Sequence, residues 1–173
     1  MATTKILIAG FGGQGILFSG KALAYTGLKA DKQISWLPSY GPEMRGGTAN
    51  VCVILSDKKI SSPIVTKYDT AIILNQQSLD KFESTVKPGG LLLYDPNGIV
   101  RHPERTDITI CRIKAVDVAA KVGNSKVYNM AVLGAYLKMK PVVEMENVDK
   151  GLAKSIPARY SDLIALNKSA IEE

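Results

Sequence analysis

The chain has 173 residues, of which 46% are hydrophobic and 22% charged, and this composition suits a globular domain with its own core. Its formal charge of +6 is scattered, as at residues 58–59 and 101–105. We interpret this excess mainly as solvated surface, with a patch for an acidic or phosphate-bearing partner as the alternative. Nucleic acid is not an expected partner, because the sequence has no basic helix, zinc-finger spacing or RNA-binding aromatic motif.

Cysteine and histidine are too few for most metal chemistry. Cys52 and Cys111 each lie in an apolar strand-like run, where a buried and reduced thiol is the expected state. An iron–sulfur cluster needs about four thiolates, so no cluster is expected on this chain alone, and the lone His102 is a poor metal ligand. No run reaches the ~20 apolar residues of a membrane span, and residues 6–10 are too short for a signal peptide. We therefore expect a cytoplasmic protein with no metal site and no membrane contact.

The first predicted elements are a strand, a helix and a second strand. Residues 5–9 form a continuous apolar run, which is typical of a buried parallel strand. After a glycine-rich turn, a helix is predicted over residues 14–28, with small residues that let it approach a sheet closely and with Gly27 as its stop signal. Residues 33–37 predict a second strand, closed by Pro38.

A long loop at residues 39–47 separates this strand from the strongest strand pattern of the chain, at residues 49–55. Another buried strand is predicted over residues 69–74. A helix over residues 78–86 follows, because its apolar side chains recur at helical spacing. The Pro-Gly-Gly sequence at residues 88–90 predicts a turn.

The second half begins with strands over residues 91–94 and 107–113 and then becomes helical. Helices are predicted over residues 115–122, 128–139, 143–155 and 162–171. This order predicts an α/β fold: a single Rossmann-like three-layer domain over residues 1–173, with a mostly parallel sheet and a helical C-terminal tail.

The first candidate site is the glycine-rich turn after the first strand, whose sequence is Gly-Phe-Gly-Gly-Gln-Gly. Its candidate residues are Gly12, Gly13, Gln14 and Gly15. Free amides at a helix start, together with the helix dipole, favour an anion. A dinucleotide site needs an acid at the end of the second strand, but Asp31 precedes that strand. Glycines that serve only close packing, or a phosphate or backbone contact within a larger assembly, are the other interpretations.

The second candidate site is the long loop, which is longer than a strand connection requires. Its candidate residues are Ser39, Tyr40, Gly41, Pro42, Glu43, Arg45, Gly46 and Gly47. The planar fork of Arg45 suits a carboxylate or a phosphate. The alternative is a structural hairpin in which Glu43 neutralises Arg45 locally.

Together the two loops resemble one protein family. The strings Gly-Gly-Gln-Gly and Ser-Tyr-Gly-Pro-Glu-Met-Arg-Gly-Gly, in this order and spacing, are similar to the gamma subunit of 2-oxoacid:ferredoxin oxidoreductases, the family of the pyruvate and 2-oxoglutarate enzymes. Asn129 with residues 133–135 resembles the family's Asn-x-x-x-Leu-Gly-Ala segment, which is a weaker cue. The resemblance spans essentially the whole chain.

The resemblance implies one subunit of a larger enzyme. Such enzymes decarboxylate a 2-oxoacid on thiamine diphosphate, pass electrons through iron–sulfur clusters to ferredoxin, and form an acyl-CoA thioester. It implies alpha and beta subunits, and a ferredoxin-like delta subunit or ferredoxin, as partners, and it places the thiamine diphosphate and the clusters on companion subunits. No cofactor is expected on this chain alone, no catalytic residue is assigned to it, and its loops are expected near the path of coenzyme A.

The Glu-Met-Arg version of the second loop favours 2-oxoglutarate as the substrate. Two other hypotheses remain at this point. One is a stand-alone Rossmann-type module that binds a nucleotide, and the other is a subunit with a purely structural role in assembly.

Overall fold

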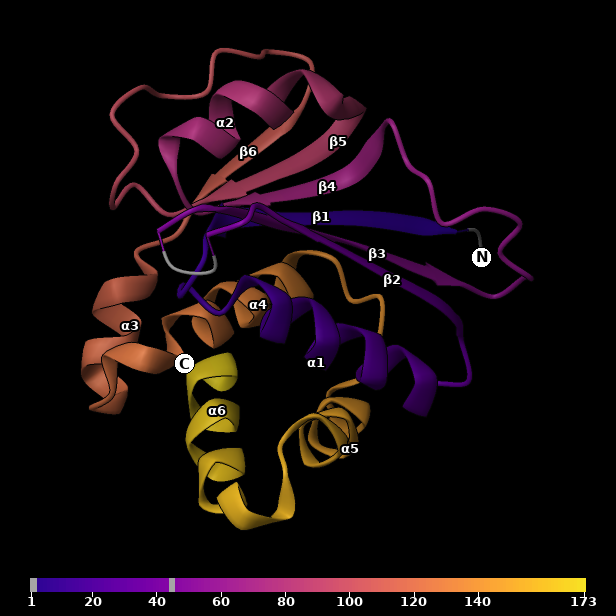
Figure 1. The fold of residues 1–173 in the computed structure, drawn as a ribbon, viewed down its shortest axis with the longest axis vertical. Coiled ribbons are helices and arrows are strands. Elements are labelled where there is room, and N and C mark those ends of the chain that lie inside the picture. The colour runs from indigo at the N-terminus through magenta and orange to yellow at the C-terminus, as the bar shows by residue number, and fades with distance from the viewer. Residues whose placement is uncertain (1–2, 44–45) are drawn as a thin grey trace.

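The computed structural model describes residues 3–43 and 46–173 (Figure 1). In this part of the chain, six strands form one sheet in the order β2-β3-β1-β4-β5-β6. The strands are β1 Thr4–Phe11, β2 Gln33–Tyr40, β3 Thr48–Ser56, β4 Tyr68–Ile73, β5 Val86–Tyr94 and β6 Thr109–Arg112. The helices are α1 Ile16–Lys29, α2 Gln76–Phe82, α3 Ala115–Val122, α4 Tyr128–Met139, α5 Met145–Ser155 and α6 Asp162–Glu172.

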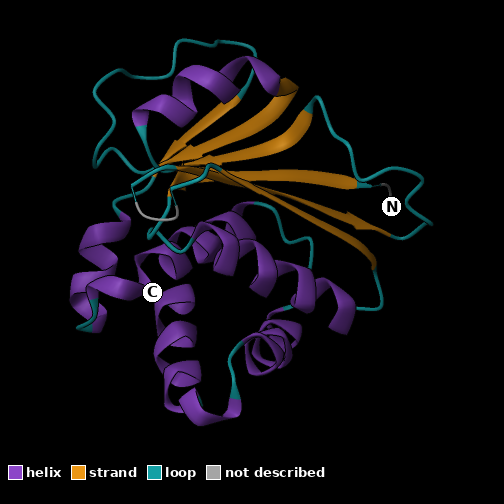
Figure 2. Cartoon of the chain, viewed as in Figure 1, coloured by secondary structure: helices purple, strands orange, loops and turns teal. Residues whose placement is uncertain are grey.

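The sheet separates two helical layers, as Figure 2 shows: α2 covers one face, and the other described helices lie on the opposite face. Alternation along β1 explains the two cores, because successive strand side chains point to opposite faces. Ile6 and Ile8 pack in the core shared with α1 and α4, whereas Leu7 and Ala9 pack in the core shared with α2. The expected three-layer α/β fold with a helical C-terminal region is confirmed.

The sheet is mostly parallel, as predicted. β1 pairs in parallel with β4, β4 with β5, and β5 with β6, whereas β3 is antiparallel to both β1 and β2. β2 therefore runs in the direction of β1 but lies two positions away, with β3 between them. As a consequence, the carboxyl ends of β1 and β2 lie beside the beginning of β3, at one end of the strands. The candidate site lies at this end.

Close packing of α1 on the sheet depends on glycine. A Cβ atom on Gly20 would approach the Val51 side chain to 2.5 Å, and one on Gly27 would approach Leu55 to 2.6 Å. The prediction that small residues bring this helix close to the sheet is therefore confirmed. Gly27 as a stop signal is wrong, since α1 continues to Lys29: this glycine is used for helix–sheet contact and not for a cap.

Two predictions near α2 are wrong. The expected helix over residues 78–86 ends at Phe82, a short 3₁₀ turn follows, and Val86 already belongs to β5. The expected turn at residues 88–90 lies inside β5, where the pairing with β4 shifts register. Gly89 has φ 74° there, and a glycine in the left-handed region allows such a bulge without ending the strand. The apolar pattern was correct, because Leu79 and Val86 share one core.

The C-terminal helices are packed on the sheet layer and on one another. A Cβ atom on Gly134 of α4 would collide with the Ile171 carbonyl oxygen of α6. The Leu-Gly-Ala segment noted in the sequence thus marks a close crossing of two helices. None of the described helices is both long enough and apolar enough to cross a membrane.

Candidate functional site

The two predicted loops are in direct contact at the carboxyl edge of the sheet. The Gly12 amide donates a hydrogen bond to the Gly47 carbonyl at 2.7 Å, and the Gly46 amide donates to the Gly12 carbonyl at 3.2 Å. Both bonds join backbone groups, so the contact needs no particular side chain. We call residues 12–15, 41–43 and 46–47 the glycine edge. The sequence predicted each loop but not the bonds between them.

Two positions in the first loop require glycine. Gly13 has φ 96° and Gly15 has φ 74°, a region that side chains disfavour. A Cβ atom on Gly15 would also collide with the side-chain amide of Asn129, which donates to the Gly15 carbonyl at 3.2 Å and to the Ser19 hydroxyl at 3.1 Å. The Asn129 side chain, noted in the sequence as a weaker family cue, therefore holds the start of α1 in place. Gly13, in contrast, has open space where a Cβ would lie.

The Gln14 side chain has a structural task. Its Oε1 atom accepts a hydrogen bond from the Phe11 amide at 2.6 Å, and its Nε2 atom donates to the Leu74 carbonyl at 3.2 Å. These bonds tie the end of β1 to the end of β4. Gln14 is therefore engaged with the chain itself, and the groups that remain available in this loop are backbone amides.

The second loop is shorter than predicted. Ser39 and Tyr40 belong to β2, where they pair with β3, and the hairpin closes through the Gly41 amide, which donates to the Thr48 carbonyl at 3.2 Å. Glu43 and Pro42 are exposed at the tip. β2 thus continues through Pro38, which was expected to close it, because β2 is an edge strand and an edge strand tolerates a residue without an amide hydrogen.

Arg45, the predicted anion ligand, lies outside the described residues. Its predicted role and its predicted pairing with Glu43 therefore remain predictions. Gly46 has φ 75°, and a Cβ on Gly47 would collide with the Glu43 carbonyl oxygen. Both glycines after Arg45 are thus needed for the shape of the hairpin.

The amino end of α1 is uncapped and faces a pocket of about 290 Å³. Within residues 3–43 and 46–173, the amides of Gly13, Gly15 and Ile16 have no hydrogen-bond partner, and the first turn of α1 contains no acid. The pocket walls are aromatic and apolar, with Phe18 and Tyr40 among them. Free amides and the helix dipole favour an anionic group here.

A second pocket, of about 210 Å³, lies on the other side of Gly13 and Gln14. Asp95, which follows β5, lines this pocket and accepts hydrogen bonds from the Asn97 and Ala115 amides at 2.8 and 3.1 Å. Burial raises the pKa of its carboxyl group. The Tyr128 hydroxyl is buried in the same wall without a partner among the described residues, and burial raises its pKa as well.

The two pockets therefore differ in what they attract. The pocket beside Tyr40 offers amides and a helix dipole and suits a phosphate or carboxylate. The pocket beside Asp95 carries a carboxyl group, which repels an anion when ionised, and a hydroxyl that can donate a hydrogen bond. Neither Asp95 nor Tyr128 was predicted from the sequence as part of a site. A polar residue directly after a buried parallel strand was the available signal for Asp95, because ligands of open α/β sheets bind at that end.

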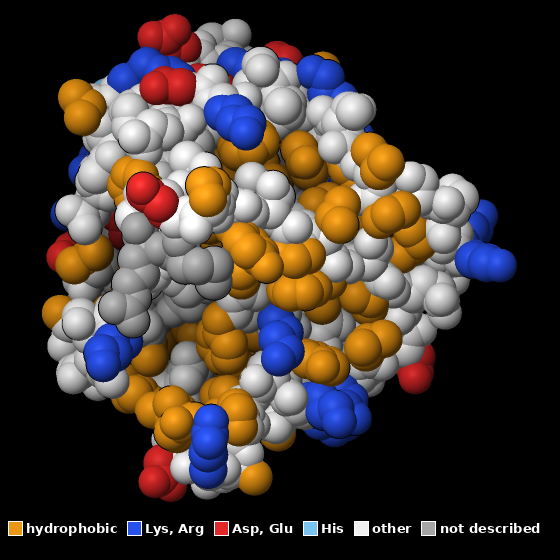
Figure 3. Space-filling model, viewed as in Figure 1, with side chains coloured by type: hydrophobic (Ala, Val, Ile, Leu, Met, Phe, Trp, Pro, Cys, Tyr) orange, Lys and Arg blue, Asp and Glu red, His pale blue; other side chains and the backbone are white. Residues whose placement is uncertain are grey.

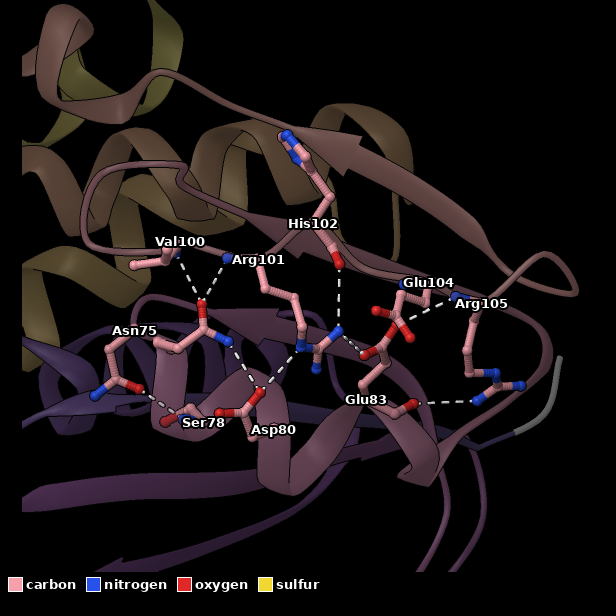
Figure 4. Close-up of polar contacts among 10 residues, drawn as sticks. Asn75, Ser78, Asp80, Glu83, Val100, Arg101, His102, Glu104 and Arg105 are labelled. Carbon is pink, nitrogen blue, oxygen red and sulfur yellow. Dashed lines mark hydrogen bonds and ion pairs between the residues drawn. The ribbon is translucent and has the colours of Figure 1, made fainter.

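The connection from β5 to β6 is held against α2 by polar side chains (Figure 4). We call this connection, residues 95–108, the strap. The Gln76 Oε1 atom accepts hydrogen bonds from two consecutive strap amides at 2.8 and 2.9 Å. The Arg101 guanidinium forms ion pairs with Asp80 at 3.1 Å and with Glu83 at 2.7 Å. The strap is therefore a clamped segment and not a loose loop.

Glu83 is the buried centre of this network, with 8% of its surface exposed. Burial alone would raise the pKa of Glu83, but hydrogen bonds from Arg101 and from the amides of Glu104 and Arg105 outweigh it and hold the pKa below its usual value. Arg105 is also paired with Asp107. Both arginines of this exposed to half-exposed segment are thus paired with acids of the chain itself, which leaves less free charge for the anion patch that was the alternative interpretation.

The lone histidine is part of the strap. The His102 Nδ1 atom lies 3.3 Å from the Tyr94 hydroxyl. Among the residues that the structure describes, no group of three His, Cys, Asp or Glu side chains could hold a metal ion.

Sequence comparison assigns the whole chain to one family. Residues 5–173 match the model of the family described as pyruvate ferredoxin/flavodoxin oxidoreductase. The 2-oxoglutarate synthase subunit KorC of Methanocaldococcus jannaschii is 34% identical, and the match covers 95% of this chain and 90% of that subunit. The ketoisovalerate oxidoreductase subunit VorA of Methanothermobacter marburgensis is 36% identical over 78% of this chain, which spans only 28% of VorA.

Solved structures show the same fold. The keto/oxoacid ferredoxin oxidoreductase gamma subunit of Geobacter sulfurreducens superposes with a TM-score of 0.82 at 29% identity, covering 98% of this chain and 94% of that one. The 2-oxoglutarate:ferredoxin oxidoreductase of Magnetococcus marinus has a TM-score of 0.87 at 22% identity, and the match covers 99% of this chain but 30% of the larger one. The resemblance to the gamma subunit is thereby confirmed, and the chain belongs to the pyruvate ferredoxin/flavodoxin oxidoreductase family.

Proposed function

We propose that this chain is the gamma subunit of a multisubunit 2-oxoacid:ferredoxin oxidoreductase, which decarboxylates a 2-oxoacid oxidatively to an acyl-CoA with ferredoxin as the electron acceptor. Alpha and beta subunits, and a ferredoxin-like delta subunit or ferredoxin, are the proposed partners. Thiamine diphosphate and the iron–sulfur clusters belong to those companions. Two cysteines on separate strands do not suit a cluster, which requires about four thiolates.

The observation that carries the proposal is the glycine edge. Two loops are joined by backbone hydrogen bonds, and the uncapped start of α1 presents free amides beside an aromatic pocket. This arrangement suits a phosphate group next to an aromatic or apolar moiety, and coenzyme A has both. The chain is therefore proposed to hold part of coenzyme A while the chemistry takes place on other subunits.

We propose 2-oxoglutarate as the 2-oxoacid. The support is the Glu-Met-Arg form of the hairpin and the similarity, over most of both chains, to subunits named for 2-oxoglutarate. The ketoisovalerate and pyruvate enzymes are the competing choices, since the chain is also similar to their subunits.

A stand-alone dinucleotide-binding module is less well supported. Such a site uses an acid at the carboxyl end of the second strand in the chain, which lies beside the first. Here the second strand, β2, is separated from β1 by the antiparallel β3 and ends at Ser39 and Tyr40 without an acid.

The test is reconstitution of the complex with its companion subunits. We expect coenzyme A-dependent ferredoxin reduction with 2-oxoglutarate, at least about tenfold higher in kcat/KM than with pyruvate or 3-methyl-2-oxobutanoate, and none from the lone chain. Arg45→Ala should raise the KM for coenzyme A by about 10- to 150-fold, the equivalent of the 1.5–3 kcal/mol of a hydrogen bond to a charged group. Arg159→Ala, at an exposed turn, is the matched control. An unchanged KM for coenzyme A in Arg45→Ala would show that Arg45 does not bind coenzyme A.

A further inference from the structure

The outer surface of α1 and β2 is unusually apolar. Leu28 is 50% exposed, Trp36 39% and Tyr40 55%. Figure 3 shows hydrophobic side chains gathered in a continuous patch across the middle of the face where α1 and β2 lie in Figure 1. We call the exposed surface of these two elements the α1–β2 patch. Contiguous apolar patches rimmed by polar groups mark sites of protein association.

The helix contributes to this patch through an outward stripe in which Lys21 and Leu28 are exposed and Leu17 and Tyr25 are half-buried. Leu17, Lys21, Tyr25 and Leu28 recur at spacings of three and four residues and therefore share one side of α1. None of the four belongs to the buried set of the helix, which faces the sheet and α5. A solvated helix normally carries polar residues on its outer side, so this stripe is suited to a further protein surface.

The charges on the patch have one sign. Neither α1 nor β2 contains an acidic residue, and Lys21 and Lys29 are exposed. The Lys21 ammonium lies 5.8 Å from the centre of the Tyr25 ring, within the patch itself. The one acid between the two elements, Asp31, is in the turn at the far end. A partner surface that complements this patch is apolar and bordered by carboxylates.

Two other occupants fit less well. A second copy of this chain, related by a two-fold axis, would place the same lysines opposite one another, and like charges in an interface are unfavourable. Addition of a strand to the edge strand β2 is obstructed by Pro38, which lacks an amide hydrogen in the middle of that strand.

We propose that the α1–β2 patch docks a companion subunit of the oxidoreductase through an apolar surface bordered by Asp and Glu side chains. The proposal rests on the proposed function and adds the surface and its chemistry. Phe18 and Tyr40 belong to the patch and also line the pocket at the start of α1. The docked subunit therefore closes that pocket, and the coenzyme A site is shared between two chains.

The test measures the dissociation constant of this chain from its co-expressed companion subunits at two salt concentrations. Sedimentation velocity or surface plasmon resonance gives this constant. Leu28→Glu places a charge in the proposed interface and Lys21→Glu reverses one, and each should weaken the complex at least about 30-fold. Leu163→Glu and Lys126→Glu are matched controls, because Leu163 is 43% exposed on α6 and Lys126 is exposed on another surface. Raising the salt concentration should weaken the wild-type complex more than the Lys21→Glu complex.

The outcomes separate the two proposals. If the wild-type chain binds no companion subunit, the proposed function fails and this inference fails with it. If the wild type and Leu28→Glu bind equally, or if the control variants weaken binding as much as the patch variants do, the function stands but the docking surface is wrong. Self-association of the isolated chain that Leu28→Glu abolishes would assign the patch to a second copy and also overturn the proposal. Melting temperatures near that of the wild type establish that each variant is folded.

Discussion

The glycine edge lies at the carboxyl ends of β1 and β2, whereas the strap runs from the carboxyl end of β5 back to the start of β6, and the two regions are built by opposite means. The glycine edge is joined by backbone hydrogen bonds at Gly12, Gly46 and Gly47. The strap is fixed by charged side chains that converge on one carboxylate, Glu83. The hydrogen bonds of the glycine edge leave amides free for a ligand, whereas the strap pairs its own arginines with acids of the chain.

This contrast predicts that the two regions respond differently to substitution. A change in the strap removes side-chain bonds and lowers stability without reaching the proposed ligand pocket. A change in the glycine edge acts through backbone conformation and affects both the fold and the proposed site. Stability and activity measurements on matched variants therefore test the comparison directly.

The largest effect is expected for Glu83→Ala. Removal of this buried carboxylate takes one acceptor from the half-buried Arg101 guanidinium, which keeps Asp80, and the side-chain acceptor from the amides of Glu104 and Arg105. We expect a loss of about 3 kcal/mol in the free energy of unfolding, measured in urea. Asp80→Ala removes the exposed partner of the same arginine and should cost about 0.5 kcal/mol. Equal losses in the two variants would show that the buried carboxylate has no special role.

Gly15→Ala should be the next largest. The left-handed backbone at this position costs a side chain about 1–2 kcal/mol, and the new methyl group must also displace Asn129. We expect a loss of about 2 kcal/mol or more in urea unfolding. Gly13→Ala is the control, because its backbone is also left-handed but its surroundings are open, and about 1 kcal/mol is expected. A larger loss at Gly13 than at Gly15 would contradict the assigned contact with Asn129.

Local sequence patterns predicted most of the strands and helices, because strand and helix periodicities follow directly from which faces are buried. Boundaries failed where packing decided: Gly27 reads as a helix stop but serves contact with the sheet, and the Pro-Gly-Gly turn lies inside a strand as a bulge. Both errors share one cause, since a glycine can serve a turn, a cap or a close approach, and only the neighbouring element decides which.

The candidate site was predicted in part. The sequence identified both loops, but it gave no sign that Gln14 is engaged by the backbone of Phe11 and Leu74. It also gave no sign of the ion pairs of Arg101, because the partners Asp80 and Glu83 come from α2 and the 3₁₀ turn that follows it, about 20 residues earlier. Contacts between distant segments depend on topology, and no local pattern carries that information.

The strap should also give the chain a defined response to acid. The pKa of Glu83 is held below its usual value in the folded chain. Its contribution to stability is therefore complete above the unfolded pKa of about 4.3 and is lost as the pH falls through the folded pKa. Wild type should exceed Glu83→Gln by about 1–2 kcal/mol in urea unfolding at pH 7, and this difference should shrink below about pH 4. A constant difference between pH 7 and pH 3 would exclude Glu83 as the titrating group.

The smallest expected effect concerns two thiols that follow the two regions. Cys52 lies on β3, after the hairpin, and Cys111 lies on β6, after the strap. Burial raises the pKa of Cys52 to about 11, so about a thousandth of this thiol is ionised at pH 8, and a thiol reagent should modify the less buried Cys111 first. Glu83→Gln loosens the strap and should accelerate modification of Cys111 about two- to fivefold while leaving Cys52 unchanged. If both rates rise together, the chain opens as a whole, and the strap and the glycine edge are not independently stabilised.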